Sequence, residues 1–369
     1  MNKLKALLGT TALVGAGLVG TAPTQASAAT VSPGGALDLT LTGFLGFRAH
    51  GGDINDARLT TGLSDGLDFS NDTEVHVVAR GRHDATGIEY GATVEFEADT
   101  NRTDNTDETW IFIRGGFGEF RFGDEDGAVD NSAVGGFTVA AGTGGIDGAI
   151  IDAIGTGVVK PYNSGDDTKI RYYTPSFGGF SLGVTYTPNN DGGDNIAANN
   201  VDPQDFVEGA LIYDGEIGGV GILASAVGSF CRIENEGPGQ DDDCWTAGGG
   251  AVVNLFGFQI GAGYFTQDVG PSVGDGSGDK DFFNVGVAYG FGPLNVSVTY
   301  GQILDSNDLV VNGNELDEPM NLVFSADIGL MPGLVLAGDV GYFDNDVKNG
   351  PNEDDDDGFQ AVTRLRLAF

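Results

Sequence analysis

Two groups of charged residues in this sequence are placed so that they could create an electric field across an aqueous gap. Nine basic residues lie on segments in which polar and apolar residues alternate, and each takes a polar position: Arg48, Arg80, Arg82, Arg114, Arg121, Lys169, Arg171, Arg364 and Arg366. The second group is five of the seven acidic residues in one long irregular stretch, 125–167: Glu125, Asp126, Asp130, Asp147 and Asp152. If the two groups face each other across water, their field orients polar solutes and sorts ions by charge.

Segments with a period of two must position the basic group. Near the start, Leu39 and Leu41 share one parity and Thr40 and Thr42 the other. Successive side chains of a strand point to opposite faces, so such a segment has one apolar and one polar face. We predict sixteen strands of this kind: 37–48, 74–82, 88–97, 108–116, 117–124, 168–175, 178–188, 205–215, 219–231, 244–255, 256–267, 281–290, 292–303, 319–330, 332–344 and 358–369.

The connections between these segments alternate in length. Links such as 84–87, 115–118, 215–219, 256–257 and 290–293 are short, whereas 49–71, 99–107, 125–167, 189–204, 232–243, 268–280, 304–318 and 345–357 are long and acidic. Short turns at one end and long loops at the other are typical of outer-membrane barrels, while a β-sandwich needs no such asymmetry. No segment after the N-terminus reaches the roughly 18 apolar residues of a membrane helix. The sequence therefore predicts an all-β protein, a 16-stranded antiparallel transmembrane β-barrel.

The N-terminus has the pattern of a secretory signal peptide. Lys3 and Lys5 precede a mostly apolar stretch, and Ala26-Ser27-Ala28 has the small residues of a cleavage site. We therefore divide the chain into a signal peptide, 1–28, and a barrel, 29–369. Removing the two lysines from the 17 basic residues leaves 15 against 54 acidic residues, a net charge of −39. Such a charge repels nucleic acid and attracts cations.

The stretch 125–167 is too long for an ordinary connection, since loops beyond about 12–15 residues are usually functional or disordered. Its apolar run, which includes Ile146 and Ile150, gives it side chains to pack. We predict that this third long loop folds into the barrel and forms a constriction, with its acidic group facing the basic wall. A simpler alternative is that the wall arginines only pair with lumenal carboxylates, and both arrangements can hold at once. Examples of such carboxylates are Glu89, Glu95 and Glu97.

Two large aromatic side chains have the lumenal parity of their strand. Trp110 and Phe112 would be poorly placed in a wet lumen. Either they pack under Ile150, Ile151 and Ile154 of the loop, or the strand shifts parity at a bulge and turns them toward lipid or a neighbouring subunit. Packing under the loop would stabilise it by about 1.5–3 kcal/mol for each buried side chain.

Two weaker patterns concern local structure. Residues 147–155 predict a short helix that Asp147 caps and Gly155 ends. Aromatic residues near strand ends fit an interfacial girdle. These residues are Phe180, Tyr186, Tyr213, Phe265, Tyr289, Tyr300, Tyr342 and Phe359.

Cys231 and Cys244 lie at the ends of adjacent predicted strands. In an exported protein, an even cysteine count supports a disulfide that closes the loop 232–243. The chain-entropy estimate for a loop of about 15 residues is roughly 3 kcal/mol. The alternative is two unpaired thiols, and neither arrangement indicates catalysis.

Two motifs beside the long loop resemble those of a known family. The chain enters the loop through FGEFRFG at 117–123, leaves it through IRYYTPSFGGF at 170–180, and ends at Phe369. These motifs resemble the trimeric general-diffusion porins of Gram-negative bacteria, most closely the alphaproteobacterial kind, over essentially the whole mature chain. The resemblance implies a homotrimer in the outer membrane, contact with lipid and lipopolysaccharide, and diffusion of ions and small hydrophilic solutes without a bound cofactor.

Structural calcium is a further implication, because some members of that family hold calcium near acidic loops. The acidic run 354–357 before Gly358 lacks the spacing of an EF-hand or an RTX repeat. We interpret it as a solvated loop tip. The sequence itself therefore assigns no metal ligand.

Three other functions fit parts of the pattern. An enzyme has only His50, His76 and His83 as imidazole bases and no serine motif beside them, so we expect no catalysis. A substrate-specific channel needs a lumenal track such as an aromatic ladder, and none is regular here. A structural or adhesive barrel blocked by its own loop is the third alternative. For a diffusion channel we expect a weak cation preference from the acidic loops, moderated by the lumenal arginines.

Overall fold

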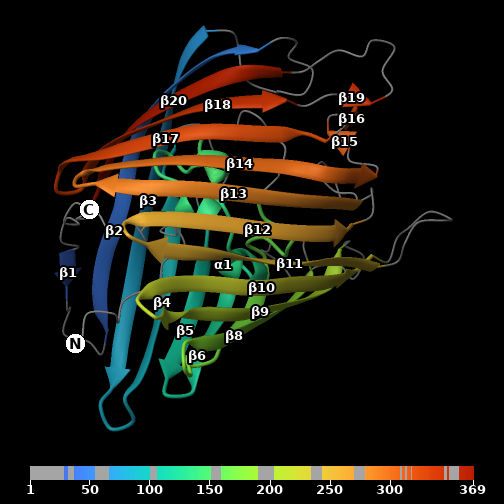
Figure 1. Ribbon diagram of the computed structural model, residues 1–369. Coiled ribbons are helices and arrows are strands. Elements are labelled where there is room, and N and C mark those ends of the chain that lie inside the picture. Colours follow the sequence, from blue (N-terminus) through green and yellow to red (C-terminus); the bar gives the residue numbers. More distant parts are fainter. Residues whose placement is uncertain are drawn as a thin grey trace.

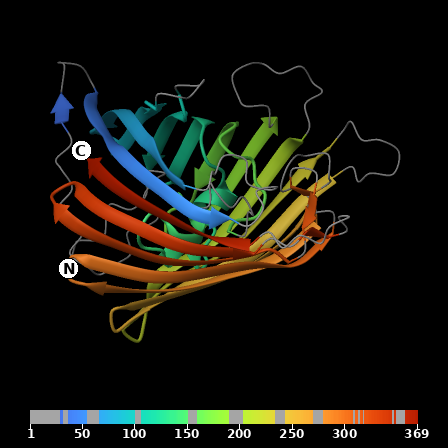
Figure 2. The same cartoon turned by 90° about the horizontal axis from the view of Figure 1, so that it is seen from above.

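The computed structural model describes residues 29–31, 37–54, 66–99, 106–150, 159–189, 203–233, 243–269, 279–307, 310–311, 314–316, 318–344, 347–348 and 357–369. Its dominant feature is one antiparallel sheet that closes on itself as a barrel (Figures 1 and 2). Within these ranges, no helix is long and apolar enough to cross a membrane.

Sixteen strands make the wall, and each pairs with the next along the chain. The last strand pairs with the first, with Arg364 opposite Arg48, so the predicted 16-stranded barrel is confirmed. The strands are β2 (Asp38–Ile54), β3 (Gly66–His83), β4 (Ile88–Glu97), β5 (Thr109–Gly115), β6 (Gly118–Asp124), β7 (Thr168–Tyr173), β8 (Phe180–Asn189), β9 (Gln204–Ile217), β10 (Val220–Arg232), β11 (Asp243–Leu255), β12 (Phe258–Asp268), β13 (Asp279–Phe291), β14 (Leu294–Asn307), β17 (Met320–Met331), β18 (Leu334–Asp344) and β20 (Asp357–Ala368).

The alternation of the sequence becomes the two faces of this wall. Large apolar side chains such as Leu45, Phe47 and Ile111 are exposed on the outside. Polar side chains of the opposite parity, such as Asn284 and Thr299, are buried on the inside. A soluble sheet protein buries its apolar face, so this reversed pattern is that of a barrel with lipid around it.

Tight turns join the strands at one end of the barrel. The β11–β12 turn places Phe256 at φ 53° and Gly257 at φ 83°. Positive φ at both central residues is the hairpin geometry that matches the twist of the flanking strands. The C-terminal residue is also paired with the first strand of the wall. Phe369 N donates to the Gly43 carbonyl at 3.0 Å, and Gly43 N donates to the Phe369 carbonyl at 3.1 Å.

Several strand boundaries differ from the sequence prediction. β2 runs on to Ile54 and β3 begins at Gly66, so both take up residues assigned to the loop 49–71. A short β1 (Ala29–Val31) pairs with β2. A separate small sheet joins β15 (Val310–Val311), β16 (Asn314–Leu316) and β19 (Val347–Lys348), in stretches predicted as loops.

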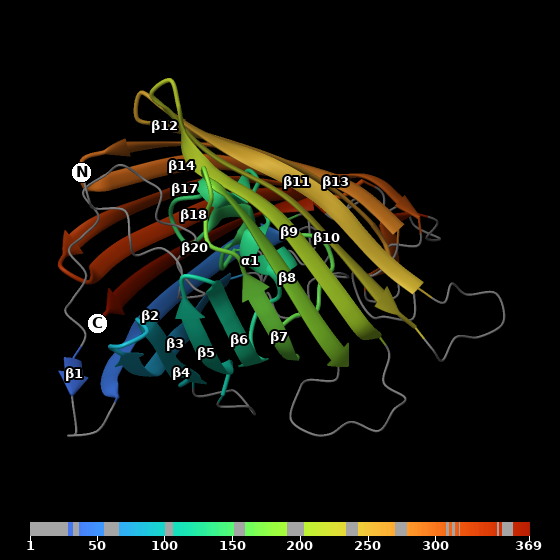
Figure 3. The same cartoon turned by 90° about the horizontal axis from the view of Figure 1, so that it is seen from below.

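The stretch between β6 and β7 contains the helical elements of the described chain. We call its described parts, 125–150 and 159–167, the internal segment. They include α1 (Ala128–Ser132), η1 (Phe137–Val139) and η2 (Gly145–Asp147). Figures 2 and 3 show α1 inside the ring of strands.

The helix predicted to begin at Asp147 is wrong over the part that the structure describes. The 3-10 turn η2 ends at that residue, and 148–150 form a bend and a turn. Residues 151–155, the rest of the predicted helix, lie outside the described ranges. The backbone N–H of Ile146 instead donates to Thr299 Oγ1 of the wall at 3.1 Å, so wall contacts outweigh local helix propensity here.

The main apolar core lies between the internal segment and the inner face of the wall. Phe265 and Phe282 stack at 5.4 Å between ring centroids, and both are fully buried. Phe265 therefore does not belong to the predicted aromatic girdle. The other members are Ala128, Val129, Ala133, Phe137, Ile146, Ala149, Ile150 and Val159 from the segment, and Ala210, Val227, Ile303, Val323, Phe343 and Val362 from the wall.

Candidate functional site: the lumenal wall and its internal segment

The internal segment follows the inner wall through backbone hydrogen bonds to wall side chains. Near its start, Ala128 N donates to Thr185 Oγ1 of β8 at 2.9 Å. Further on, Gly136 N donates to Asn284 Oδ1 of β13 at 2.7 Å, and Ala141 N to Ser297 Oγ of β14 at 2.8 Å. These short polar side chains satisfy backbone donors that would otherwise be buried without partners.

One wall carboxylate holds both limbs of the segment. Glu208 of β9 accepts from Val129 N through Oε2 and from Ser164 N through Oε1, each at 2.8 Å. The Glu208 side chain is fully buried. The entering and leaving parts of the segment are therefore fixed to one point on the wall.

A second carboxylate holds the far end of the described run. Thr143 N donates to Asp339 of β18, 3.1 Å from Oδ1, and the Thr143 hydroxyl donates to Oδ2 of the same carboxylate. Gly142 N donates to Asp327 Oδ2 of β17 at 3.0 Å. The segment thus reaches from β8 round the wall to β18.

Glycines on three adjacent strands make room for this path. Gly250 of β11 lies opposite Gly263 of β12, and Gly261 lies opposite Gly286 of β13. A Cβ added at Gly263 would lie 2.9 Å from the carbonyl oxygen of Val134, and one at the other three positions would overlap segment backbone. Backbone can therefore approach backbone only because these positions lack side chains.

The lumenal aromatics of β5 face inward, as the parity of the strand predicts, but they do not pack under Ile150. Ile150 belongs to the main core and lies beside Gly341 of β18. Trp110 instead lies under a guanidinium, with Arg121 Cζ 5.1 Å from its ring centroid. The proposed Ile150 contact is therefore wrong, while Ile151 and Ile154 lie outside the described residues.

Glu125 joins the segment to the basic strands β6 and β7. Its Oε2 lies 3.0 Å from Arg121 Nη1 and 2.7 Å from Arg171 Nη2, and Lys169 Nζ donates to its backbone carbonyl. Burial raises the pKa of Glu125, while Arg171 and Arg121 act in the opposite direction. Glu125 therefore contacts Arg121, Arg171 and Lys169 directly, whereas the sequence predicted that the acidic and basic groups face each other across water.

Two other acidic residues of the segment pair within it. Lys160 Nζ lies 2.5 Å from Asp130 Oδ1 and 3.9 Å from Asp147 Oδ2. Burial lowers the pKa of Lys160, but the two carboxylates outweigh it and the pKa is raised. Burial also raises the pKa of Asp147, with Lys160 opposing.

Within the described ranges, the Asp126 carboxylate makes no ion pair, and Arg171 Nη1 donates instead to the Asp126 backbone carbonyl at 2.7 Å. Its backbone N–H donates to Glu108 Oε1 at 3.2 Å. Burial, with Asp130 and Glu108 nearby, raises the pKa of Asp126 to about 9. The surroundings of Asp126 therefore favour its protonated form. Asp152, the fifth predicted acidic residue, lies outside the described ranges.

The remaining basic residues line a continuous part of the wall. Arg48 of β2 donates to Asp72 of β3, and Arg364 Nη1 of β20 lies 3.7 Å from the same carboxylate oxygen. Arg366 lies over Phe44, with Cζ 3.9 Å from the ring centroid. All nine predicted basic residues come from β20, β2, β3, β5, β6 and β7, which lie on one side of the barrel.

Pairing with wall carboxylates also occurs, as the simpler alternative predicts. Arg114 Nη2 lies 2.7 Å from Glu89 Oε2, and Arg82 Nη1 lies 3.3 Å from Glu89 Oε1. Arg80, which lies on β3 with Arg82, is exposed. Glu95 differs from Glu89, because its ion-pair partner is His76.

Solvent exposure differs along the inner wall. On the basic side, the side chains of Arg82 of β3 and Arg114 of β5 are 62% and 31% exposed. At the junction with the segment, Arg121 and Arg171 are only 7% and 3% exposed. On the side that the segment covers, Glu208 is 1% exposed and Asn284 and Thr299 are fully buried. Water therefore reaches the inner wall at β3 and β5, and not at the junction with the segment on β6 and β7.

The comparisons with known proteins agree with this architecture. The family model for Gram-negative porins matches residues 9–348. The chain belongs to the Gram-negative porin family. Three solved structures share its fold: the anion-selective porin from Comamonas acidovorans (17% identity, 90% of this chain and 100% of that chain, TM-score 0.61), the outer membrane protein OmpT from Vibrio cholerae (12%, 91% and 100%, 0.61) and a triple mutant of the Rhodopseudomonas blastica porin (14%, 90% and 100%, 0.55). No curated protein matches the chain in sequence.

Membership of this family, together with the closed barrel, gives the activity of the chain. This porin forms a channel in the outer membrane through which small solutes diffuse passively. The fold and family are those of a transport channel rather than of an enzyme.

Sequence reasoning missed several residues that position the internal segment. Lys160 is the single basic residue of the stretch 125–167, which was a usable signal for an internal ion pair. Nothing in the sequence distinguishes Glu208 and Asp339 from the many other lumenal carboxylates. Their role becomes visible only from the path of the segment. The four wall glycines share lumenal parity, but their alignment depends on strand register.

The two cysteines of this porin occupy facing positions on adjacent strands. Cys231 of β10 pairs in register with Cys244 of β11, and their Cα atoms lie 5.0 Å apart. They form a disulfide buried beside Phe206 and Val269. The bond ties the two strands together where they lead into the stretch predicted as the loop 232–243.

Proposed function

We propose that solutes cross this porin between the internal segment and the basic wall of β20, β2, β3, β4 and β5. The observation that carries this proposal is the difference in exposure between the two sides of the lumen. The inward side chains of β8–β14, β17 and β18 are largely covered, whereas Arg82 and Arg114 are open to water. The segment then acts as a constriction, and the arginines form one wall of the passage.

The charges on the two sides predict a weak cation preference. The stretch 125–167 carries seven carboxylates and one lysine. Direct pairing of Glu125 and protonation of Asp126 reduce the negative charge that faces water. The wall arginines oppose it further, so the net preference is small.

A planar-bilayer experiment tests both parts of this proposal. In a KCl gradient, the reversal potential of the wild type should indicate modest selectivity for potassium. Deleting residues 133–158 should enlarge the conductance and weaken the selectivity while the barrel remains folded. Unchanged conductance after the deletion, with native heat-resistant migration in gels, would place the passage elsewhere.

The Arg48→Gln and Arg114→Gln variants test the basic wall separately. Each removes one positive charge from the proposed passage, so potassium selectivity should increase. Arg232→Gln is the matched control, because Arg232 pairs with Asp205 at the end of β10 and its side chain is half exposed. Equal shifts in all three variants would indicate a surface-charge effect and no lumenal field.

The assembly and processing of this porin are further proposals. We infer a homotrimer that contacts outer-membrane lipid and lipopolysaccharide, and a signal peptide removed after residue 28. The structure of OmpT from Vibrio cholerae is that of a trimer, and apolar side chains cover the outer wall of this chain. Native mass spectrometry of the exported protein tests both the copy number and the mass of the mature chain.

A further inference from the structure

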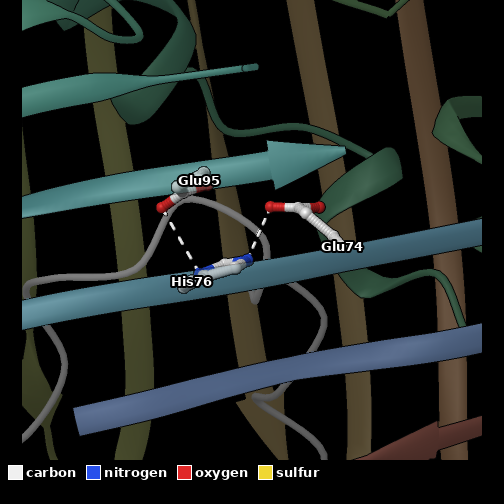
Figure 4. Close-up of side chains that lie close together, drawn as sticks. All are labelled: Glu74, His76 and Glu95. Carbon is white, nitrogen blue, oxygen red and sulfur yellow. Dashed lines mark ion pairs between the residues drawn. The ribbon is translucent and has the colours of Figure 1, made fainter. Parts of the chain in front are cut away.

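One lumenal cluster differs from the other charged groups of the basic wall. Glu74 and His76 are two residues apart on β3, so they share a face, and Glu95 of β4 lies directly opposite His76 in the strand pairing. His76 Nε2 lies 2.6 Å from Glu74 Oε1, and His76 Nδ1 lies 3.4 Å from Glu95 Oε1. Figure 4 shows both carboxylates turned toward the imidazole.

The cluster is buried and its polar atoms are incompletely paired. His76 is 6% exposed and Glu95 is 2% exposed. Although these contacts are short, neither His76 Nε2 nor Glu95 Oε1 has a partner in hydrogen-bonding geometry among the residues that the structure describes. A buried carboxylate oxygen without such a partner is costly, so a ligand that binds it would be favoured.

The neighbouring wall carboxylates are compensated in a different way. Asp72, Glu89 and Glu119 each have an arginine in contact. Glu95 has only the imidazole of His76 as an ion-pair partner within the described ranges. The carboxylates of Glu74, Glu108 and Asp107 add negative charge near Glu95. Arg366 offsets part of this charge near Glu74. The cluster therefore lacks a full positive charge where the other carboxylates have one.

We propose that Glu74, His76 and Glu95 bind a divalent transition-metal cation of the Zn²⁺ type, which enters from the lumen. One ligand atom from each side chain can be chosen so that all three lie within 4.8 Å of one another. Ligands at about 2.0–2.2 Å from tetrahedral zinc are about 3.3–3.6 Å apart, so the cluster needs only small side-chain shifts. Water completes the fourth position.

The donor set selects the class of cation. One imidazole and two carboxylates suit zinc and similar transition metals. Calcium and magnesium prefer six or more oxygen ligands, which this cluster does not offer. The second carboxylate can alternatively hold the free ring nitrogen of His76, an arrangement that usually strengthens a metal-bound histidine.

Metal binding by the untagged full barrel in detergent tests the proposal directly. Isothermal titration with Zn²⁺ should give one site per chain, and Co²⁺ should produce the visible absorption of a tetrahedral complex. The His76→Gln and Glu95→Gln variants should each bind at least tenfold more weakly. His50→Gln is the matched control, because His50 is another histidine of the wall and its Nε2 lies 2.7 Å from Ser70 Oγ; it should bind as the wild type does.

A channel measurement gives an independent readout. Bound Zn²⁺ adds two positive charges to the basic wall, so micromolar Zn²⁺ should move the reversal potential of the wild type toward chloride and leave His76→Gln unchanged. If a variant fails to fold, anomalous diffraction at the zinc edge from wild-type crystals locates the ion without mutation. Zinc at another position, the absence of stoichiometric binding, or a response to pH alone would overturn the proposal.

Discussion

Glu125 and Arg171 form an ion pair in which both side chains are almost completely removed from solvent, 0% and 3% exposed, with Oε2 and Nη2 2.7 Å apart. Arg121 shares the same carboxylate oxygen. The pair joins the start of the internal segment to the strand by which the chain leaves it, β7. A single carboxylate therefore compensates two buried guanidinium groups.

Replacing Glu125 by Gln should strongly destabilise this junction. Breaking a buried ion pair by removing one partner costs about 3–5 kcal/mol, because the remaining charge stays buried without compensation. The free energy of unfolding can be measured by denaturant titration of the refolded barrel. Trp110 is a suitable fluorescent reporter, since its ring lies 5.1 Å from Arg121 Cζ.

Glu119→Gln is the control for this prediction. Glu119 also contacts Arg121, with Oε1 2.8 Å from Nε, but its side chain is more exposed and Glu125 remains to compensate the guanidinium. Its loss should therefore cost less. Equal losses for the two variants would contradict a special role for Glu125.

Replacing Glu208 by Gln should loosen both limbs of the internal segment together. The amide keeps one acceptor oxygen, so either Val129 N or Ser164 N loses its partner. A hydrogen bond to a charged group contributes about 1.5–3 kcal/mol, and exchange of the two amide protons should accelerate accordingly. Hydrogen-exchange mass spectrometry measures this, with exposed Glu216→Gln on the same strand as control. Protection lost at one limb alone would show that the limbs are held independently.

A side chain at Gly261 or Gly286 should displace the internal segment. A Cβ at either position overlaps the carbonyl oxygen of Gly135 or Gly136. Overpacking of this kind costs about 1–3 kcal/mol, and here the segment can move away while the wall stays paired. Gly261→Val and Gly286→Val should therefore raise single-channel conductance toward that of the loop deletion.

Gly209→Ala is the control for steric displacement. Gly209 lies on β9 between inward-facing Glu208 and Ala210, and a Cβ there meets nothing within 4 Å. Its conductance should equal that of the wild type. If the Gly261→Val and Gly286→Val variants have wild-type conductance, the wall strands have shifted to accommodate the valine and the segment has kept its place.

Much of this architecture could be read from the sequence because strand parity is a local property. The side of the wall that Arg121 or Arg171 faces follows from the residues beside each in the chain. The apolar run around Ile146 and Ile150 likewise predicted that the long loop packs against something. These inferences required no knowledge of which strands are neighbours.

The parts that the sequence could not predict depend on register and on the path of the segment. Gly250 meets Gly263 only because β11 and β12 pair in one particular register. The sequence predicted Ile150 as a partner of Trp110, and the actual contact with Arg121 depends on where the segment turns. The helix α1 was missed because its five residues have no side-chain cap and their N–H groups are held by the wall.

Raising the pH should loosen the internal segment through Asp126. Burial, Asp130 and Glu108 raise the pKa of Asp126 from 3.8 to about 9. The folded segment therefore binds the proton more tightly than the unfolded chain does. This contribution to stability is fully present below about pH 4 and is lost as the pH rises toward 9. Glu125 and Asp147, whose pKa values burial also raises, act with the same sign.

Hydrogen exchange at Ala128 and Val129, corrected for the intrinsic rate, measures this dependence between pH 5 and pH 9. Protection should decrease with pH in the wild type, and Asp126→Asn should reduce the slope because the amide is neutral throughout. A residual slope of the same sign should remain from Glu125 and Asp147. An unchanged slope in Asp126→Asn would mean that Asp126 is already ionised in the folded barrel, and its charge would then add to the cation preference of the passage.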